Sequence, residues 1–172
     1  MDKKKCILDY AKKQNPANLS TLGFPVIKTE EQFRNSYAMH DLAVDDVARQ
    51  YLKNEFNLYS FGVDLREYEV IIENELPDYI AERESRLFCF DVKSKSSTKS
   101  FGWVNERAAT SYRKLAKECS VTIYLIFVQV VARRLLGRTG NCSIEDEPIS
   151  KRKVWDGNIV WVFRWKEGLP YL

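Results

Sequence analysis

Hydrophobic side chains change their period several times along the chain, and each period predicts a type of element. Residues 121–131, VTIYLIFVQVV, are apolar almost throughout and rich in β-branched side chains, which is typical of a strand covered on both faces. Residues 103–119 repeat their apolar side chains with a helical period instead. Residues 29–56 show a helical period, as one helix or two, after the capping-box-like sequence TEEQ, and residues 6–13 predict a further short helix.

Shorter runs between these helices predict strands and turns. DYIA at residues 78–81 and RLFCFDVK at residues 86–93 are expected to be two strands joined by the charged turn ERES. LYSFGVDL and YEVIIENE, within residues 58–75, predict strand segments before them. Residues 153–165 are expected to form a hairpin, because Asp-Gly is a strong turn signal, and residues 137–150 are expected to form a loop.

The order of these elements predicts an α/β fold with a mixed central β-sheet, flanked by helices and followed by a C-terminal β-hairpin. The strand–helix–strand step over residues 87–131 needs a crossover, so part of the sheet is expected to be parallel. A length of 172 residues fits a single domain with a sizeable core, and we expect one domain over residues 1–172.

Composition narrows the class of protein further. The chain is 45% hydrophobic and 30% charged, which is ordinary for a soluble globular domain. Its longest apolar run, residues 121–132, is too short for a membrane span, and the N-terminus lacks the apolar stretch of a secretory signal, so a cytoplasmic location is expected. Four scattered cysteines and the single His40 argue against a zinc site, and Cys89 and Cys119 are expected to be reduced core residues.

Charge is distributed unevenly although the net charge is only +3. Residues 41–84 hold twelve Asp and Glu against four Lys and Arg, whereas residues 93–117 hold seven Lys and Arg against one Glu. An acidic segment beside a basic one suits a site that holds both a cation and a polyanion, but two solvated faces of opposite sign would give the same pattern.

The hairpin at residues 78–93 places an aspartate in each arm. If its turn is centred between Glu84 and Ser85, residues whose numbers sum to 169 face one another, so Asp78 lies opposite Asp91. Lys93 then shares a face with Asp91. Like charges directly opposite each other destabilise a sheet, so the carboxylates are solvated apart, one is protonated, or a divalent cation such as Mg²⁺ or Mn²⁺ lies between them.

These residues resemble the motif of the restriction-endonuclease-like, or PD-(D/E)XK, nuclease superfamily. The motif here is Pro77-Asp78, twelve intervening residues, and Asp91-Val92-Lys93. The resemblance covers a core over residues 38–131, where a helix, the two motif strands, a second helix and a further strand follow one another in that superfamily's order. Residues 1–37 and 132–172 would be peripheral additions.

A second stretch, VDDVARQYLKNEF, resembles the first helix of Holliday-junction-resolvase-like members of the superfamily. On that match, Asp45 stands where those proteins carry a helix carboxylate, usually Glu. The shorter Asp side chain leaves open whether Asp41, Asp45 or Asp46 takes this role.

The resemblance implies metal-dependent hydrolysis of phosphodiester bonds in DNA, with branched or recombination and repair substrates as one expectation within it. Asp78 and Asp91 would bind Mg²⁺ or Mn²⁺ together with the Val92 carbonyl and Asp45, and Lys93 would orient the attacking water and offset developing negative charge. The sequence does not distinguish DNA from RNA. The candidate phosphate contacts are Lys95, Lys99, Arg107 and Lys114.

Two alternatives remain open at this point. The chain could be a non-catalytic nucleic-acid-binding or assembly protein that keeps the nuclease fold, although Lys93 beside two aspartates has no purpose in a scaffold. The hairpin charges could also be surface decoration on an unrelated α/β protein. Phe101 and Trp103 could stack on bases but are more often core residues, and Trp155, Trp161 and Trp165 could cover the sheet or form the face of a homodimer.

Overall fold

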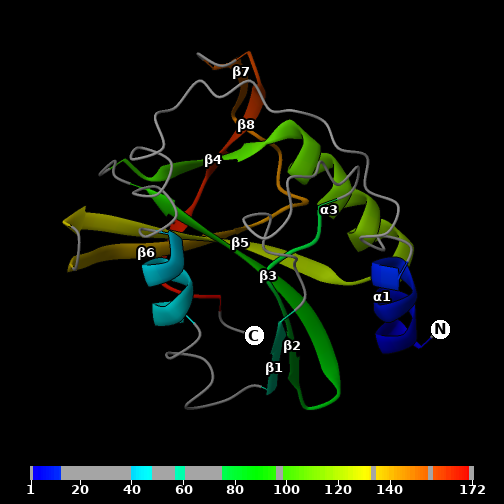
Figure 1. Cartoon of the computed structure of the whole chain (residues 1–172). Helices are drawn as coiled ribbons and strands as arrows, with labels where there is room; N and C mark the ends of the chain where they lie inside the picture. The colour runs from blue at the N-terminus through cyan, green and yellow to red at the C-terminus, as the bar shows by residue number, and fades with distance from the viewer. Residues whose placement is uncertain are drawn as a thin grey trace.

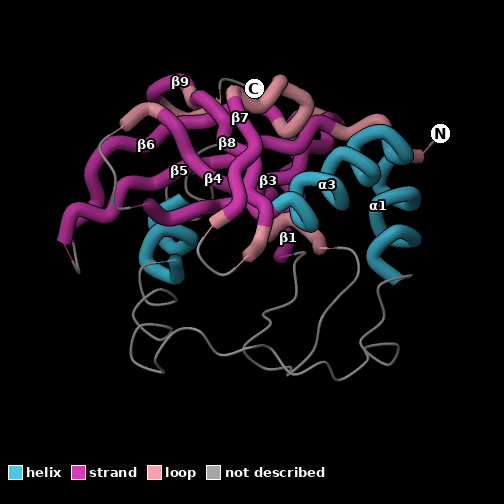
Figure 2. Tube along the Cα trace, turned by 90° about the horizontal axis from the view of Figure 1, so that it is seen from above, coloured by secondary structure: helices cyan, strands magenta, loops and turns pink. Residues whose placement is uncertain are grey.

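The structure consists of two β-sheets, with helices packed against them (Figures 1 and 2). It is a computed structural model that describes residues 2–12, 40–47, 57–60, 75–95, 99–132, 135–154 and 157–170. The helix expected over 29–56 is described only at 40–47, and the segment YEVIIENE, except Glu75, and Trp155 lie outside the described residues. Within the described part of the chain, no helix is long and apolar enough to cross a membrane.

The larger sheet is the mixed central sheet that the sequence predicts. Its strand order is β1-β2-β3-β5-β6-β9. The pairing of β3 with β5 is parallel, and the other described pairings in this sheet are antiparallel. The six strands are β1 (Asn57–Ser60), β2 (Tyr79–Arg83), β3 (Arg86–Lys95), β5 (Thr122–Ala132), β6 (Leu135–Ser143) and β9 (Lys166–Glu167).

The β2–β3 hairpin has the predicted register. Tyr79 pairs with Phe90 and Ile80 with Cys89, so the paired numbers sum to 169. Glu84 and Ser85 form the two-residue turn with positive φ angles of 49° and 65°. Positive φ at both central positions is the geometry whose twist matches that of paired strands, which explains why the register is centred there.

The crossover from β3 to β5 contains a strand that the sequence analysis did not predict. The helix expected from residue 103 begins at Glu106, as α3 (Glu106–Cys119), and residues 101–105 form β4 (Phe101–Asn105). Burial alternates along β4, and each of its residues pairs with a residue of β8 (Ile159–Arg164). This long-range pairing overrides the helical period that continues into α3.

The smaller sheet has three strands in the order β4-β8-β7. β7 (Ser150–Lys153) and β8 are the predicted C-terminal hairpin, and they pair in antiparallel fashion. The hairpin joins β4 rather than the central sheet, and it lies beside α3 and β4 in Figure 1.

The prediction of a loop over residues 137–150 is wrong for residues 137–143, which belong to β6. This strand lines the free edge of β5 and is rich in glycine and polar residues, which conceals its strand character in the sequence. At Gly140, an added Cβ would lie 1.7 Å from the Trp165 ring. Glycine is therefore needed where Trp165 packs against the strand.

The central sheet separates two hydrophobic cores. Phe88, Phe90 and Val92 of β3 face one core, together with Ala43 and Val47 of the helical residues 40–47. Cys89 faces the other core, which α3 covers. The predicted alternation of faces along β3 is confirmed.

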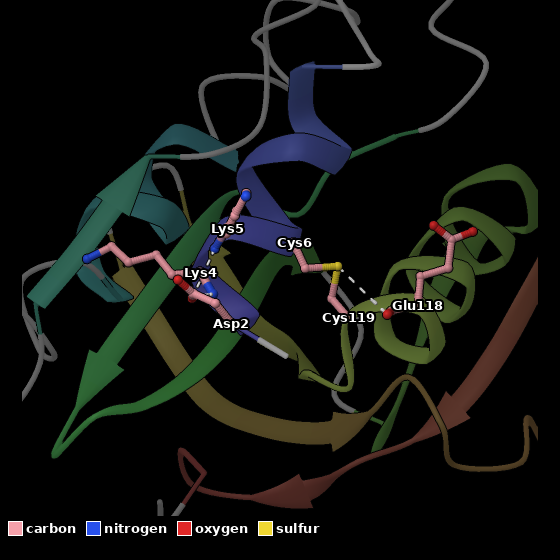
Figure 3. The surroundings of a disulfide bond; sticks show 6 residues. All are labelled: Asp2, Lys4, Lys5, Cys6, Glu118 and Cys119. Atoms are coloured by element: carbon pink, nitrogen blue, oxygen red, sulfur yellow. Dashed lines mark hydrogen bonds between the residues drawn. A yellow bond between two sulfur atoms is a disulfide. The ribbon is translucent and has the colours of Figure 1, made fainter.

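A disulfide joins the N-terminal helix α1 (Lys3–Lys12) to the end of α3 (Figure 3). Cys6 is bonded to Cys119, so the expectation that Cys119 is a reduced core residue is wrong, whereas Cys89 is free and buried as expected. Ile7 and Tyr10 of α1 are buried in the same core as α3, and this packing brings the two cysteines together. A pairing across 113 residues leaves no local signal in the sequence.

Cys6→Ser is expected to lower the free energy of unfolding by about 2–4 kcal/mol, because the bridge restricts a long loop in the unfolded chain. Urea unfolding without reductant measures the difference. Adding reductant should bring the wild-type protein down to the variant and leave the variant unchanged. Equal stability of the two oxidised proteins would show that the bridge contributes nothing.

Candidate active site

The Asp91 carboxylate is the centre of the site. Its side chain is 1% exposed, on the face of β3 that α3 covers. The Tyr112 hydroxyl, on α3, donates a hydrogen bond of 2.7 Å to Asp91 Oδ1. Burial, followed by the Asp91 charge, raises the pKa of Tyr112 well above its ordinary value, so Tyr112 remains a donor at any physiological pH.

The second oxygen of the Asp91 carboxylate, Oδ2, has a different neighbour. Lys93 Nζ lies 2.8 Å from Asp91 Oδ2, which is buried, and the two groups form a close charge-assisted pair. A carboxylate oxygen has more than one lone pair, so Oδ2 can contact a further cation besides Lys93.

Lys93 remains charged in this environment. Burial by itself would lower the pKa of its ammonium group, but the carboxylates of Asp91, Asp78 and Glu75 together outweigh burial and raise that pKa above its ordinary value. Its side chain as a whole is 29% exposed, and its ammonium group lies beside a buried carboxylate. A lysine in this state can contact a phosphate but cannot act as a base near neutral pH.

Asp78 lies immediately before β2, where the ladder with β3 ends. Its Oδ2 accepts a hydrogen bond of 2.7 Å from the backbone amide of Val92. Asp78 is thereby held against the segment Asp91-Val92-Lys93. The structure brings together four of the residues predicted from the motif: Asp78, Asp91, Val92 and Lys93.

His40 also lies at this site, although the sequence analysis did not single it out. Its Nε2 is 4.0 Å from Asp78 Oδ2, and its Nδ1 is 3.9 Å from Asp41 Oδ1. Burial, and then the Lys93 charge, lower the pKa of His40, against smaller opposing effects of Asp91, Asp41 and the Val92 carbonyl. The ring is therefore neutral near pH 7, the form in which imidazole donates a lone pair.

Asp41 and Asp45, two of the candidate helix carboxylates, differ in their surroundings. Asp45 is exposed, and its charge acts on Tyr79, whose pKa is raised first by burial and then by Asp78 and Asp45. Asp41 lies beside His40, with its side chain 47% exposed. Among the groups that shift the pKa of Lys93, the described carboxylates are Asp91, Asp78 and Glu75, and none of them comes from this helix.

Two of the candidate phosphate contacts are held by other protein groups. Arg107 Nε donates to Glu75 Oε1 at 2.7 Å, and its Nη2 contacts the same oxygen. Lys95 Nζ donates to the carbonyls of Lys99 and Phe101 and lies 4.0 Å from the centre of the Trp165 ring. Burial, with the charge of Arg138, lowers the pKa of Lys95 to about 8.

Lys99 and Lys114, the other two candidates, have exposed side chains. Lys99 precedes β4 and lies 5.6 Å from the centre of the Phe101 ring. Lys114 is on α3, on the side away from the core. Arg107 and Lys95 therefore bind protein groups, whereas Lys99 and Lys114 have exposed side chains.

The donor set fits a hard divalent cation that keeps much of its water. Among the described residues, no three His, Cys, Asp or Glu side chains are grouped to hold a metal ion. Mg²⁺ binds to proteins through one or two carboxylates and completes its shell with water and substrate phosphate. Asp78, Asp91 and the Val92 carbonyl are a donor set of that type.

No protein-family model matches the chain, and no curated protein sequence matches it. The structure is similar to that of Hjc, a Holliday junction resolvase from the archaeal hyperthermophile Archaeoglobus fulgidus. The two chains are 10% identical, and the similarity has a TM-score of 0.49 over 73% of this chain and 83% of that chain. At this identity and score, the similarity carries no evidence about chemistry, so a function must be inferred from this chain's own residues.

Tyr112→Phe is expected to destabilise the protein by about 1.5–3 kcal/mol, because it removes a hydrogen bond to a charged, buried acceptor. Chemical denaturation in EDTA measures the loss. Tyr124→Phe is the matched control, because the Tyr124 hydroxyl, on β5, donates to no described residue. Equal effects of the two substitutions would mean that the Asp91 contact is not what stabilises the fold.

Proposed function

We propose that the chain is a metal-dependent endonuclease that hydrolyses phosphodiester bonds in DNA. The observation that carries the proposal is the Asp91 carboxylate, buried at 1% exposure with the Lys93 ammonium 2.8 Å from Oδ2, and with Asp78 held by the amide of the next residue, Val92. Two carboxylates gathered at one strand segment suit a divalent cation that keeps much of its water.

Asp78, Asp91 and the Val92 carbonyl would hold a Mg²⁺ or Mn²⁺ ion. Once bound, such an ion polarises a phosphate and lowers the pKa of a water molecule at neutral pH. Tyr112 fixes Asp91 through Oδ1, and the Val92 amide fixes Asp78 through Oδ2. Both carboxylates are therefore oriented before substrate arrives, which avoids a reorganisation cost during the reaction.

Lys93 would contact the scissile phosphate. Its raised pKa keeps it charged, and its side chain is partly exposed, at 29%. A fixed positive charge stabilises the negative charge that accumulates on phosphorus oxygens in the transition state. Lys93 is thus an electrostatic and positioning group, and the proton from water must go to another acceptor.

A nucleic-acid substrate is favoured because the basic segment over residues 93–117 follows the carboxylates directly in sequence. Lys99 and Lys114 have exposed side chains on this segment. A branched junction is one substrate within this proposal. Cleavage of duplex, single-stranded and four-way-junction DNA and of RNA would rank the substrates.

Purified protein is expected to cut at least one of these substrates with Mg²⁺ or Mn²⁺ and to be inactive with EDTA. Asp91→Asn and Lys93→Ala should each reduce the rate by about 10²–10³-fold or more, because Asp91 would hold the metal ion and Lys93 would contact the reacting phosphate. Lys3→Ala removes an exposed charge on α1, outside the basic segment, and should leave the rate nearly unchanged. Absence of metal-dependent cleavage of every substrate would refute the proposal.

Either His40 or Asp45 could be the residue of the helical segment 40–47 that supports metal binding, and variants distinguish the two. His40→Ala is expected to weaken Mn²⁺ binding and cleavage by about 10- to 100-fold, because His40 lies beside Asp78. Asp45→Asn is expected to change both much less, because Asp45 is exposed. Mn²⁺ affinity by electron paramagnetic resonance, together with cleavage rates, checks this. The opposite order would assign the helix role to Asp45.

A further inference from the structure

The small sheet β4-β8-β7 presents two unlike faces. Paired residues of antiparallel strands share a face, and the face alternates along each strand. Val104, Trp161 and Phe163 lie on the inner face and are buried in the core that α3 covers. Phe101 and Arg164, which pair directly, therefore lie on the opposite face.

We call this opposite side the outer face of the small sheet, and it is defined by Phe101, Trp103, Arg152 and Arg164. Trp103 pairs with Val162, which in turn pairs with Ser150, so Arg152 follows two residues along the same face. Trp103 is 52% exposed, and both arginines are exposed. Val162, which pairs with Trp103 on this face, is 0% exposed, so neighbouring side chains cover it. Trp103 itself leaves about half of its surface in water, so burial accounts for only part of its stabilisation.

The charge of the outer face has one sign. The paired strands place no acidic side chain on it among the described residues. Arg152 Nε donates to Ser150 Oγ at 3.3 Å, and neither Arg152 nor Arg164 has an acidic partner in the described structure. Lys99 adds a further cation, 5.6 Å from the centre of the Phe101 ring.

We propose that the outer face of the small sheet binds single-stranded nucleic acid, with bases stacked on Trp103 and Phe101 and phosphates at Arg152 and Arg164. Residues two apart on a strand are about 7 Å apart, which is far enough for each ring to take its own base. Exposed aromatic side chains on a sheet stack bases in this way, and flanking cations track the backbone.

Two other occupants suit the face less well. In a two-fold symmetric dimer the same face meets itself, so Arg152 and Arg164 would meet like charges. An anionic membrane would attract the arginines, but insertion needs several large apolar side chains. Of the three that are exposed among the described residues, Trp103, Ile149 and Ile159, the strand register places only Trp103 on this face.

This binding site is separate from the proposed cleavage residues, which lie at β2 and β3. The outer face is built from β4, β7 and β8. Its occupancy can be measured in EDTA, where no metal-dependent hydrolysis occurs. A failure of this inference would therefore leave the cleavage proposal standing, and the reverse also holds.

The test is fluorescence anisotropy with a labelled oligothymidylate of about 16 nucleotides, in EDTA. Trp103→Ala is expected to weaken binding by about 5- to 100-fold, whereas Trp103→Phe keeps a ring and should recover most of the loss. Ile149→Ala is the matched control, because Ile149 is 51% exposed but does not belong to the outer face. Heparin has charge without bases, so its affinity should not respond to Trp103→Ala.

The arginines provide an independent readout. Arg152→Ala with Arg164→Ala should reduce the slope of log affinity against log salt by about 1.4, because each phosphate contact on a single strand contributes about 0.7. The proposal would be overturned if wild type and Trp103→Ala bound oligothymidylate with equal affinity while circular dichroism showed both to be folded. A dimer, detected by analytical ultracentrifugation, that Trp103→Ala dissociates would also overturn it, as would binding to phosphatidylserine vesicles in preference to the oligonucleotide.

Discussion

The buried Asp91 carboxylate is the constraint on which the rest of the site depends. Moving a carboxylate out of water costs several kcal/mol even after the protein relaxes. Tyr112 offsets part of that cost through Oδ1, and the Lys93 ammonium offsets part through its charge. The same carboxylate, with Asp78 and Glu75, keeps Lys93 protonated despite burial.

The topology explains how this carboxylate comes to be buried. β3 lies between β2 and β5, and its parallel pairing with β5 requires a crossover. That crossover contains α3, which covers the Asp91 face of the sheet and supplies Tyr112. A direct antiparallel connection would have left this face without the helix, and Asp91 would then lie in water as an ordinary surface residue.

Local signals account for the parts of the fold that the sequence predicts. The β2–β3 register depends on a two-residue turn, and the alternation along β3 depends only on the period of a strand. The parts that were missed depend on contacts between distant segments. In β6, Gly140 makes room for the Trp165 ring, which comes from much later in the chain. The disulfide forms because α1 packs against α3. His40 is placed by its helical segment, whose Ala43 and Val47 pack in the core that β3 faces.

Stability alone does not account for the residues at this site. A buried ion pair often stabilises a protein no more than apolar side chains of the same volume would. A purely structural role would therefore not require Asp91 and Lys93 on β3. The charged groups are instead gathered at one end of β3, where Lys93 pairs with Asp91 and the Val92 amide holds Asp78. In the function proposed above, a divalent cation bound with a phosphate is the ligand whose charge and donor preferences match these groups.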